Sequence, residues 1–305
     1  MSCDPGLQSY PSRPVRLVVG YAPGGTTDIA ARLVGQWLSD SLGRQFIIEN
    51  QPGANGNIAT EAVVRAPADG YTLLMLSGAN AINATLYEKL NFVFVRDITP
   101  VASVLSVPNL MMVHPLFPAR SVPEFISYAK ANPGKVNYGS SGIGSELHVV
   151  AEMFKMMAGI DLVPVQYRGT GPMLTDLLGG QLQVTFADMP PSVEHVRAGR
   201  LHALAVTTSK RTELLPELPN VAEFLPGYDA DAWFGVGAPH NTPIEIIEKL
   251  NRETNAVLAS PVMKAQLADL GATPMTMTPA DFGKLIAAET EKWAKVIRAA
   301  NIKIE

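Results

Sequence analysis

Two turns in this chain combine glycines with hydroxyl side chains and could bind an anion. The first reads P-G-G-T-T-D at residues 23–28 and follows an apolar run at residues 17–19. If a helix begins there, its first N–H groups have no intrahelical acceptor, and the helix dipole adds partial positive charge. Glycines lack a Cβ, so a ligand can approach the backbone closely. The turn predicts an anion site, with the candidate residues Tyr21, Pro23, Gly24, Gly25, Thr26, Thr27 and Asp28.

The letters of this turn exclude two familiar phosphate motifs. Gly20 and Gly25 have the outer spacing of a nucleotide P-loop, but Thr26 stands where the lysine would be. The G-x-G-x-x-G fingerprint of dinucleotide sites is also absent. Without the lysine, a carboxylate fits better than a nucleotide phosphate. Asp28 is an awkward neighbour for an anion, and we expect its carboxylate to accept local backbone N–H groups. A plain strand-to-helix turn with a threonine cap is the alternative.

The second turn reads G-S-S-G-I-G-S at residues 139–145, between a predicted strand at 136–138 and a predicted helix at 146–157. In open α/β sheets, ligands bind beyond the carboxyl ends of the strands, where both turns are predicted to lie. Ser140, Ser141, Gly142 and Ser145 are therefore candidate ligand residues. If the two turns belong to domains that face each other, they can converge on one cleft.

Ser145 and His148 are three residues apart and could touch on a helix. A nucleophile–base pair would make this an enzyme, but the segment does not match G-x-S-x-G in any register. No acidic residue is obviously placed to orient the histidine, although Glu152 lies one turn further on. We favour a ligand-facing polar cluster that includes His148, with helix capping and a catalytic pair as the alternatives.

Polar residues also follow three other predicted strands. Tyr167, Arg168 and Gly169 come after the strand at 162–165, and the planar guanidinium fork suits a carboxylate. The alternative for Arg168 is a solvated surface residue. Asp188 ends the strand at 184–187 and could orient Arg168, bind a ligand hydroxyl or cap a helix. Ser77 and Asn80, after the strand at 72–77, are candidate neutral donors, whereas P-A-D-G-Y-T at 67–72 predicts a purely structural turn.

Short β-rich runs alternate with helical patterns along most of the chain, which predicts an α/β fold with parallel sheets and helices on both faces. Two extended stretches, at 101–114 with a break at Pro108 and at 225–237, could cross between lobes. The expected lobes are 10–108 with 228–305, and 109–227. Predicted strands lie at 16–21, 46–49, 72–77, 101–105, 110–114, 136–138, 162–165, 184–187, 204–207 and 233–237.

Composition excludes several classes of protein. The 305 residues carry a net charge of −4 with no basic block, so we expect no nucleic-acid partner. No apolar run reaches the ~20 residues that span a bilayer. Cys3 is the single cysteine and the five histidines are scattered, so we expect no disulfide, metal or cofactor. Residues 1–9 are expected to be a disordered leader or a recombinant remnant.

The chain resembles the substrate-binding proteins of tripartite tricarboxylate transporters, the Bug-type extracytoplasmic receptors. The resemblance covers residues 9–305, and its motifs occur in matching order. They are P-S-R-P-V-R-L-V-V at 11–19, P-G-G-T-T-D at 23–28, E-N-Q-P-G-A-N-G-N-I-A at 49–59, A-D-G-Y-T-L-L at 68–74, Y-G-S-S-G-I-G-S-E-L-H at 138–148, V-Q-Y-R-G-T-G-P at 165–172 and D-L-L-G-G-Q at 176–181.

The resemblance implies a periplasmic Venus-flytrap protein of type II topology, with two doubly wound lobes joined by two crossing strands. It implies an interlobe cleft that captures a small carboxylate, either a dicarboxylate or an aromatic carboxylate, for delivery to membrane permease subunits. In the family, the loops that match residues 21–28 and 140–145 hold the proximal carboxylate through backbone N–H groups and ordered waters.

Two departures from the family pattern leave the distal half of the ligand open. The family often has lysine in place of Arg168, and Asn55 stands where P-G-A-G-G has a further glycine. Family members carry a signal peptide, so we expect a mature or recombinant form, and we expect a monomer. The other functions considered are a hydrolase or transferase that uses Ser145 and His148, and a cytoplasmic carboxylate-sensing domain.

Overall fold

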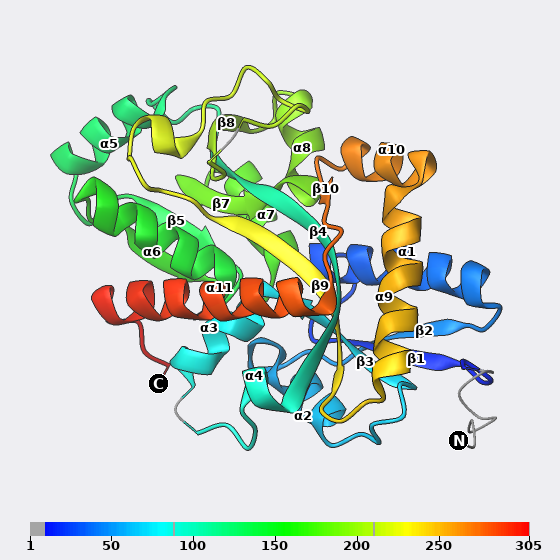
Figure 1. Ribbon diagram of the computed structural model, residues 1–305. Helices are drawn as coiled ribbons and strands as arrows, with labels where there is room; N and C mark the ends of the chain where they lie inside the picture. Colours follow the sequence, from blue (N-terminus) through cyan, green and yellow to red (C-terminus); the bar gives the residue numbers. More distant parts are fainter. Residues whose placement is uncertain (1–9, 88, 210, 305) are drawn as a thin grey trace. The chain divides into compact units, whose positions relative to one another are not determined.

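The computed structural model describes residues 10–87, 89–209 and 211–304 (Figure 1). The predicted leader at 1–9, with Cys3, lies outside the described residues. The chain forms two compact units. Unit 1 comprises the described residues of Met1–Leu105, Trp233–Ala265 and Pro274–Lys292, and unit 2 those of Ser106–Ala232, Gln266–Thr273 and Trp293–Glu305.

Two long strands carry the chain from one unit to the other, as predicted. The boundary falls inside β4 (Ile98–Val113) after Leu105, and inside β9 (Asp231–Pro239) before Trp233. Pro108 does not break β4, although the sequence predicted two separate strands there.

Two C-terminal segments, 266–273 and 293–304, belong to unit 2, whereas the sequence analysis placed the whole C-terminal stretch in lobe 1. Gly271, in the first segment, packs closely on Met189 of α8 (Met189–Arg197). A Cβ at Gly271 would lie 2.1 Å from the Met189 Sδ atom. The limits of the two lobes as rigid bodies stay a prediction.

Unit 1 is built on a sheet with the strand order β2-β1-β3-β9. β1, β2 and β3 are parallel, and β9 runs antiparallel to β3. Because the parallel strands share one direction, their carboxyl ends meet at one edge, where α1, η1 and α3 begin. The elements are β1 Val15–Val19, α1 Thr26–Leu42, β2 Phe46–Asn50, η1 Ala54–Gly56, α2 Asn57–Val64, β3 Thr72–Ser77, α3 Gly78–Leu86, α4 Phe94–Asp97 and α9 Ile244–Ala259.

Most of the apolar side chains of these strands and helices are buried in the core of unit 1. Every residue of β3 is buried, as expected of a central parallel strand. Trp233 on β9 packs edge-to-face on Phe282 of α11, with ring centroids 5.7 Å apart. The remaining C-terminal elements are α10 Pro261–Asp269, β10 Thr273–Pro274 and α11 Pro279–Ala299.

Unit 2 repeats the plan around its own sheet. β7, β5 and β6 are parallel neighbours in that order, and β4 runs antiparallel between β7 and β8. A separate apolar core includes Leu110, Met173 and Leu177. The elements are α5 Val122–Ala131, β5 Asn137–Ser140, α6 Glu146–Ala158, β6 Val163–Gln166, α7 Thr170–Leu178, β7 Val184–Asp188, α8 Met189–Arg197, β8 His202–Val206 and η2 Val221–Glu223.

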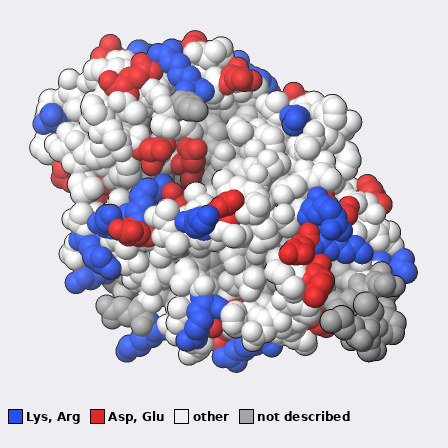
Figure 2. Space-filling view, viewed as in Figure 1, with Lys and Arg blue, Asp and Glu red and all other residues white. Residues whose placement is uncertain are grey.

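On the face shown in Figure 2, basic and acidic side chains are interspersed rather than gathered by sign. This agrees with the small net charge of −4. Within the described ranges, no helix is both long and apolar enough to cross a bilayer.

Candidate functional site

The turn between β1 and α1 leaves its two central glycines open to a ligand. Gly25 is the N-cap of α1 in an extended conformation (φ −82°, ψ 168°), and Gly24 has φ +90°. A Cβ on either residue would meet no atom within 4 Å. Gly20 differs, because a Cβ there would lie 2.7 Å from the Cα of Gly56. Gly24 and Gly25 therefore leave space, whereas Gly20 allows two loops to pack.

Asp28 is neutralised by local partners, as we expected. Its Oδ2 accepts the Gly24 N–H (3.0 Å) and the Arg32 Nε–H (2.9 Å), and its Oδ1 accepts from Asn50 Nδ2 (2.9 Å). Burial alone would raise the pKa of Asp28, but these hydrogen bonds outweigh it and hold the pKa below its usual value. Three donors therefore hold the carboxylate in the loop, and they reduce its repulsion of a bound anion.

The other residues of this turn lie in the first turn of α1 or in the segment just before it. Thr26 and Thr27 are buried in the first turn of α1, while Pro23 is exposed. The N–H groups of Thr27 and Asp28 belong to that first turn and have no acceptor within the helix. The carbonyl of Tyr21 accepts from Asn50 (2.9 Å), and its hydroxyl approaches the Asn55 carbonyl (3.3 Å).

A network of three asparagines links η1, α2 and α3 at this edge of unit 1, and sequence reasoning missed it. Asn55 adopts a left-handed conformation (φ 52°), which asparagine tolerates better than most residues and which suits a position where the family has glycine. Its Nδ2 donates to Asn83 Oδ1 (2.8 Å), and Asn83 donates to Asn57 Oδ1 (3.0 Å). The residues are up to 28 positions apart, so no local pattern indicated the network.

Ser77 and Asn80 form a capping box at the start of α3. The Ser77 oxygen accepts the Asn80 N–H, and Asn80 Oδ1 accepts the Ser77 N–H (2.9 Å). Asn80 Nδ2 donates to Thr60 (3.0 Å). Both side chains thus have partners inside unit 1, and a ligand contact for them stays a prediction.

The glycine turn of unit 2 follows β5 and ends at the start of α6. The Ser140 hydroxyl lies within hydrogen-bonding distance of Gln166 Oε1 and of the Gly142 carbonyl. Ser141 and Gly142 are half-buried, and Gly142 has φ +139°, which favours glycine. Ser145 is the N-cap of α6, and its Oγ accepts the His148 N–H (3.3 Å).

The geometry does not support a Ser145–His148 catalytic pair. His148 Nδ1 accepts the Gly144 N–H (3.0 Å), and the Ser145 oxygen accepts from the His148 backbone rather than donating to its ring. Burial, as the main cause, lowers the pKa of His148, against the opposing effect of Glu152. The ring therefore positions the turn instead of activating a nucleophile.

The loop after β6 lies beside this turn. The Tyr167 N–H donates to the Ser140 carbonyl (2.9 Å), and its hydroxyl donates to Asp176 (2.7 Å). Burial and this hydrogen bond raise the pKa of Tyr167 to about 12. Gly169 is the N-cap of α7 with φ +118°.

Arg168 is exposed next to this loop. Across the described ranges it has no hydrogen bond or ion pair, so the structure does not bring it together with Asp188. Asp188 is the N-cap of α8, opposite Asn109 in the β4–β7 ladder. Asn109 was missed from the sequence. It is fully buried, and neither polar atom of its side chain has a partner in the described part of the chain.

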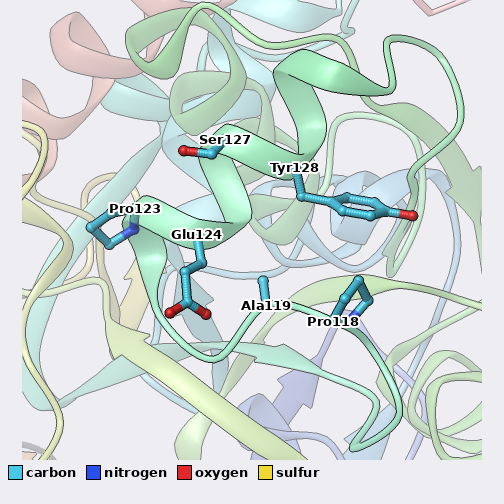
Figure 3. Close-up of a pocket in the computed structure, with 6 residues that line it drawn as sticks. All are labelled: Pro118, Ala119, Pro123, Glu124, Ser127 and Tyr128. Carbon is cyan, nitrogen blue, oxygen red and sulfur yellow. The ribbon is translucent and has the colours of Figure 1, made fainter.

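A surface hollow in unit 2 is a separate feature (Figure 3). It measures about 330 Å³ and lies between α5 and the loop that precedes it, lined by Pro118, Ala119, Pro123, Glu124, Ser127 and Tyr128. No predicted site residue lines it, and the Glu124 carboxylate at its edge would repel an anion. The described residues contain no group of side chains suited to a metal ion.

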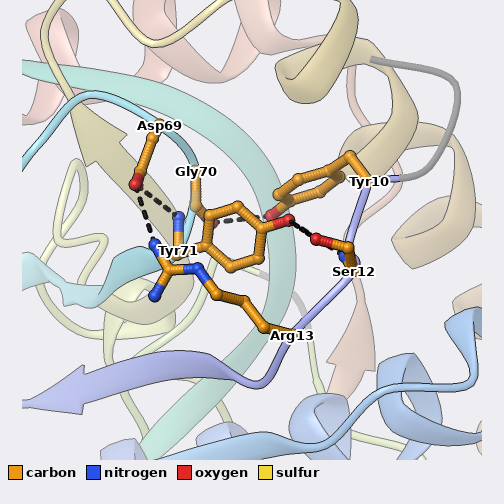
Figure 4. Close-up of polar contacts among 6 residues, drawn as sticks. All are labelled: Tyr10, Ser12, Arg13, Asp69, Gly70 and Tyr71. Carbon is orange, nitrogen blue, oxygen red and sulfur yellow. Dashed lines mark hydrogen bonds and ion pairs between the residues drawn. The ribbon is translucent and has the colours of Figure 1, made fainter. Parts of the chain in front are cut away.

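The turn at 67–72 is structural, as predicted, and fastens the first described residues (Figure 4). The Tyr10 hydroxyl donates to the Gly70 carbonyl (2.6 Å), and Arg13 pairs with Asp69 (3.0 Å). Asp69 also accepts the Tyr71 N–H (3.0 Å), which closes the turn.

Comparisons with known proteins agree with this arrangement. The model of the tripartite tricarboxylate transporter family receptor matches residues 30–302. Protein BugT of Bordetella pertussis is 37% identical over 300 residues, which are 97% of this chain and 92% of BugT. Rpa4515 of R. palustris, solved with adipate, has a TM-score of 0.92 and 41% identity, over 96% of this chain and 99% of its own. MatC of Rhodopseudomonas palustris, solved with malate, has a TM-score of 0.87 and 32% identity, over 94% and 100%.

The fold is that of periplasmic binding proteins, seen at high similarity in these structures. The chain therefore belongs to the tripartite tricarboxylate transporter receptor family, whose members are solute-binding receptors and not enzymes.

Proposed function

We propose that this protein binds a small carboxylate, with dicarboxylates and aromatic carboxylates as the candidate classes. The observation that carries the proposal is the open backbone at Gly24 and Gly25, where α1 begins. A carboxylate placed there would meet N–H groups of the first helical turn and the positive end of the helix dipole. Relatives solved with adipate and malate support the same class of ligand.

The charges at this turn favour a carboxylate over a multiply charged group such as a phosphate. Asp28 is the acidic residue of the turn at 23–28, and three hydrogen bonds already satisfy it. The turn holds no lysine that could pair with a multiply charged phosphate. Neutral backbone donors suit a single carboxylate, whose charge spreads over two oxygens.

The turn at 140–145 in unit 2 is the proposed second half of the site. It offers the same combination of a strand end, glycines and a helix N-terminus. In this proposal the ligand lies between the two units, and the units close on it by rotation about the two crossing strands, as hinged domains do.

The proposed setting is the periplasm, where the loaded receptor delivers its ligand to membrane permease subunits as a monomer. Family membership supports this role. A cytoplasmic carboxylate sensor has no specific observation in its favour.

A thermal-shift screen tests the proposal. The purified protein is heated with aliphatic dicarboxylates, aromatic carboxylates and matched amides that lack the charge. A ligand at about 100 times its Kd adds about 2.7 kcal/mol to the free energy of unfolding. We expect stabilisation by at least one carboxylate and none by its amide. Stabilisation by amides and carboxylates alike, or by no carboxylate, contradicts the proposal.

A further inference from the structure

The imidazole of His148 is built into the glycine turn that it follows. Its Nδ1 accepts the Gly144 N–H at 3.0 Å, and the backbone N–H of His148 donates to Ser145 Oγ at 3.3 Å. The residue is only 7% exposed. An Nδ1 that accepts a hydrogen bond carries no proton, so the ring is neutral with its proton on Nε2. A protonated ring would present two donors, and one of them would point at the Gly144 N–H.

The surroundings hold the ring in this orientation. It stacks on Tyr138 of β5, with centroids 6.2 Å apart and planes inclined by 17°. The Tyr138 hydroxyl donates to Glu152 Oε1 (2.5 Å), which also accepts from Lys155 (2.8 Å). One turn of α6 thus supplies both an acidic and a basic group behind the ring.

The ionisable groups on the elements around His148 are few. α6 carries Glu146, Glu152 and Lys155, β5 carries Tyr138, and β7 ends at Asp188. The Tyr228 hydroxyl donates to the Val150 carbonyl on α6. Glu152 favours a charged ring and Lys155 opposes it, while burial disfavours the charge most. The neutral ring is therefore the form that this environment selects near pH 7.

We propose that neutral His148 is a positioning residue for the anion-binding turn at 140–145, and that its protonation releases the turn and weakens carboxylate binding. This inference rests on the proposed function, because it assigns the turn a ligand. A protonated ring also brings positive charge toward an anion. That charge would be offset by Glu152 behind the ring, whereas the loss of the Gly144 hydrogen bond would disturb the backbone donors directly.

The size of the effect follows from the fraction of neutral His148. If only this form is competent, the apparent Kd rises by about twofold where His148 is half protonated, and by about tenfold one pH unit lower. The lowered pKa places this window below the ordinary histidine value of about 6.5.

Two substitutions separate positioning from packing. In His148→Asn the amide oxygen can take the place of Nδ1 and accept the Gly144 N–H, but it does not titrate. His148→Leu is similar in size and offers no acceptor. His240→Asn replaces a histidine at an exposed position elsewhere in the chain and is the matched control.

The experiment measures carboxylate affinity by calorimetry from pH 8 to pH 5, and the His148 ring and the Gly144 amide by NMR titration without ligand. We expect His148→Asn to bind more tightly than His148→Leu at pH 8 and to lose the acid weakening that His240→Asn keeps. His148→Leu should bind more weakly at every pH. Equal pH dependence in wild type and His148→Asn, or tighter binding as the pH falls, overturns the inference.

The NMR readout separates this inference from the proposed function. If no carboxylate binds at pH 8, the proposed function fails. The positioning role then stands only if the Gly144 amide still shifts with the titration of the His148 ring. If the chemical shift of the Gly144 amide does not change as the His148 ring titrates, the positioning role is overturned whether or not carboxylates bind.

Discussion

Gly25→Val isolates the close approach of a ligand to the start of α1. The backbone of Gly25 lies in the β region, which valine adopts without strain, and its Cβ would meet no protein atom within 4 Å. The fold should therefore tolerate the change, since the gain of about 0.5 kcal/mol from removing a glycine opposes the weaker N-cap that valine makes. The isopropyl group would instead fill the space through which a ligand reaches the backbone.

The expected loss of affinity follows from the hydrogen bonds that the valine would prevent. A hydrogen bond to a charged group contributes about 1.5–3 kcal/mol, which corresponds to about 10- to 100-fold in Kd. Calorimetry with the best carboxylate from the screen measures the loss, and thermal unfolding confirms that the variant is folded.

Two other glycines of unit 1 serve as controls. Gly283→Ala places a Cβ in ordinary contact with Pro100, at 3.6 Å, and should change neither affinity nor fold. Gly20→Ala would force a Cβ to 2.7 Å from the Gly56 Cα and should destabilise the protein. A folded Gly25→Val protein with wild-type affinity would refute the reasoning.

Three further outcomes are expected. Arg168→Gln should weaken a dicarboxylate by about 10- to 100-fold and leave a matched monocarboxylate nearly unchanged, because exposed Arg168 is free to pair with a distal acid; equal losses in calorimetry would exclude this role. Small-angle scattering should give a smaller radius of gyration with a saturating ligand, and no compaction would argue against closure of the lobes. The lowered pKa of Asp28 means that its contribution to stability is present above the unfolded value of about 3.9 and is lost as the pH falls through the folded pKa. Asp28→Asn should therefore flatten the acid side of the stability curve, and an unchanged slope in urea unfolding between pH 5 and pH 2 would contradict this.

Local sequence patterns predicted the strands and helix starts whose conformation depends on neighbouring residues. The strand at 72–77 was found at the predicted residues, and a helix does begin in the turn at 23–28, at Thr26. Asp28 accepts the Gly24 N–H, as expected of a local backbone donor, whereas its side-chain partner Arg32 was not predicted.

Contacts between distant residues could not be predicted in this way. The Asn55–Asn83 hydrogen bond joins η1 to α3, and its two residues are 28 positions apart. The continuity of β4 past Pro108 was missed because local propensity cannot show that the strand crosses between two units there. The hydrogen bond from Gly144 to His148 spans only four residues, but a sequence does not show which ring nitrogen faces the turn.

The central claim is that the turns at 23–28 and 140–145 bind the same carboxylate. It is tested most directly by backbone amide NMR of the wild-type protein during titration with the carboxylate that stabilises it most. The account predicts saturable shifts at Gly24, Gly25 and Thr27 in unit 1 and at Ser141 and Gly142 in unit 2, all with one Kd. Saturable shifts confined to one turn, or centred on the hollow beside Ser127 and Tyr128, would contradict it.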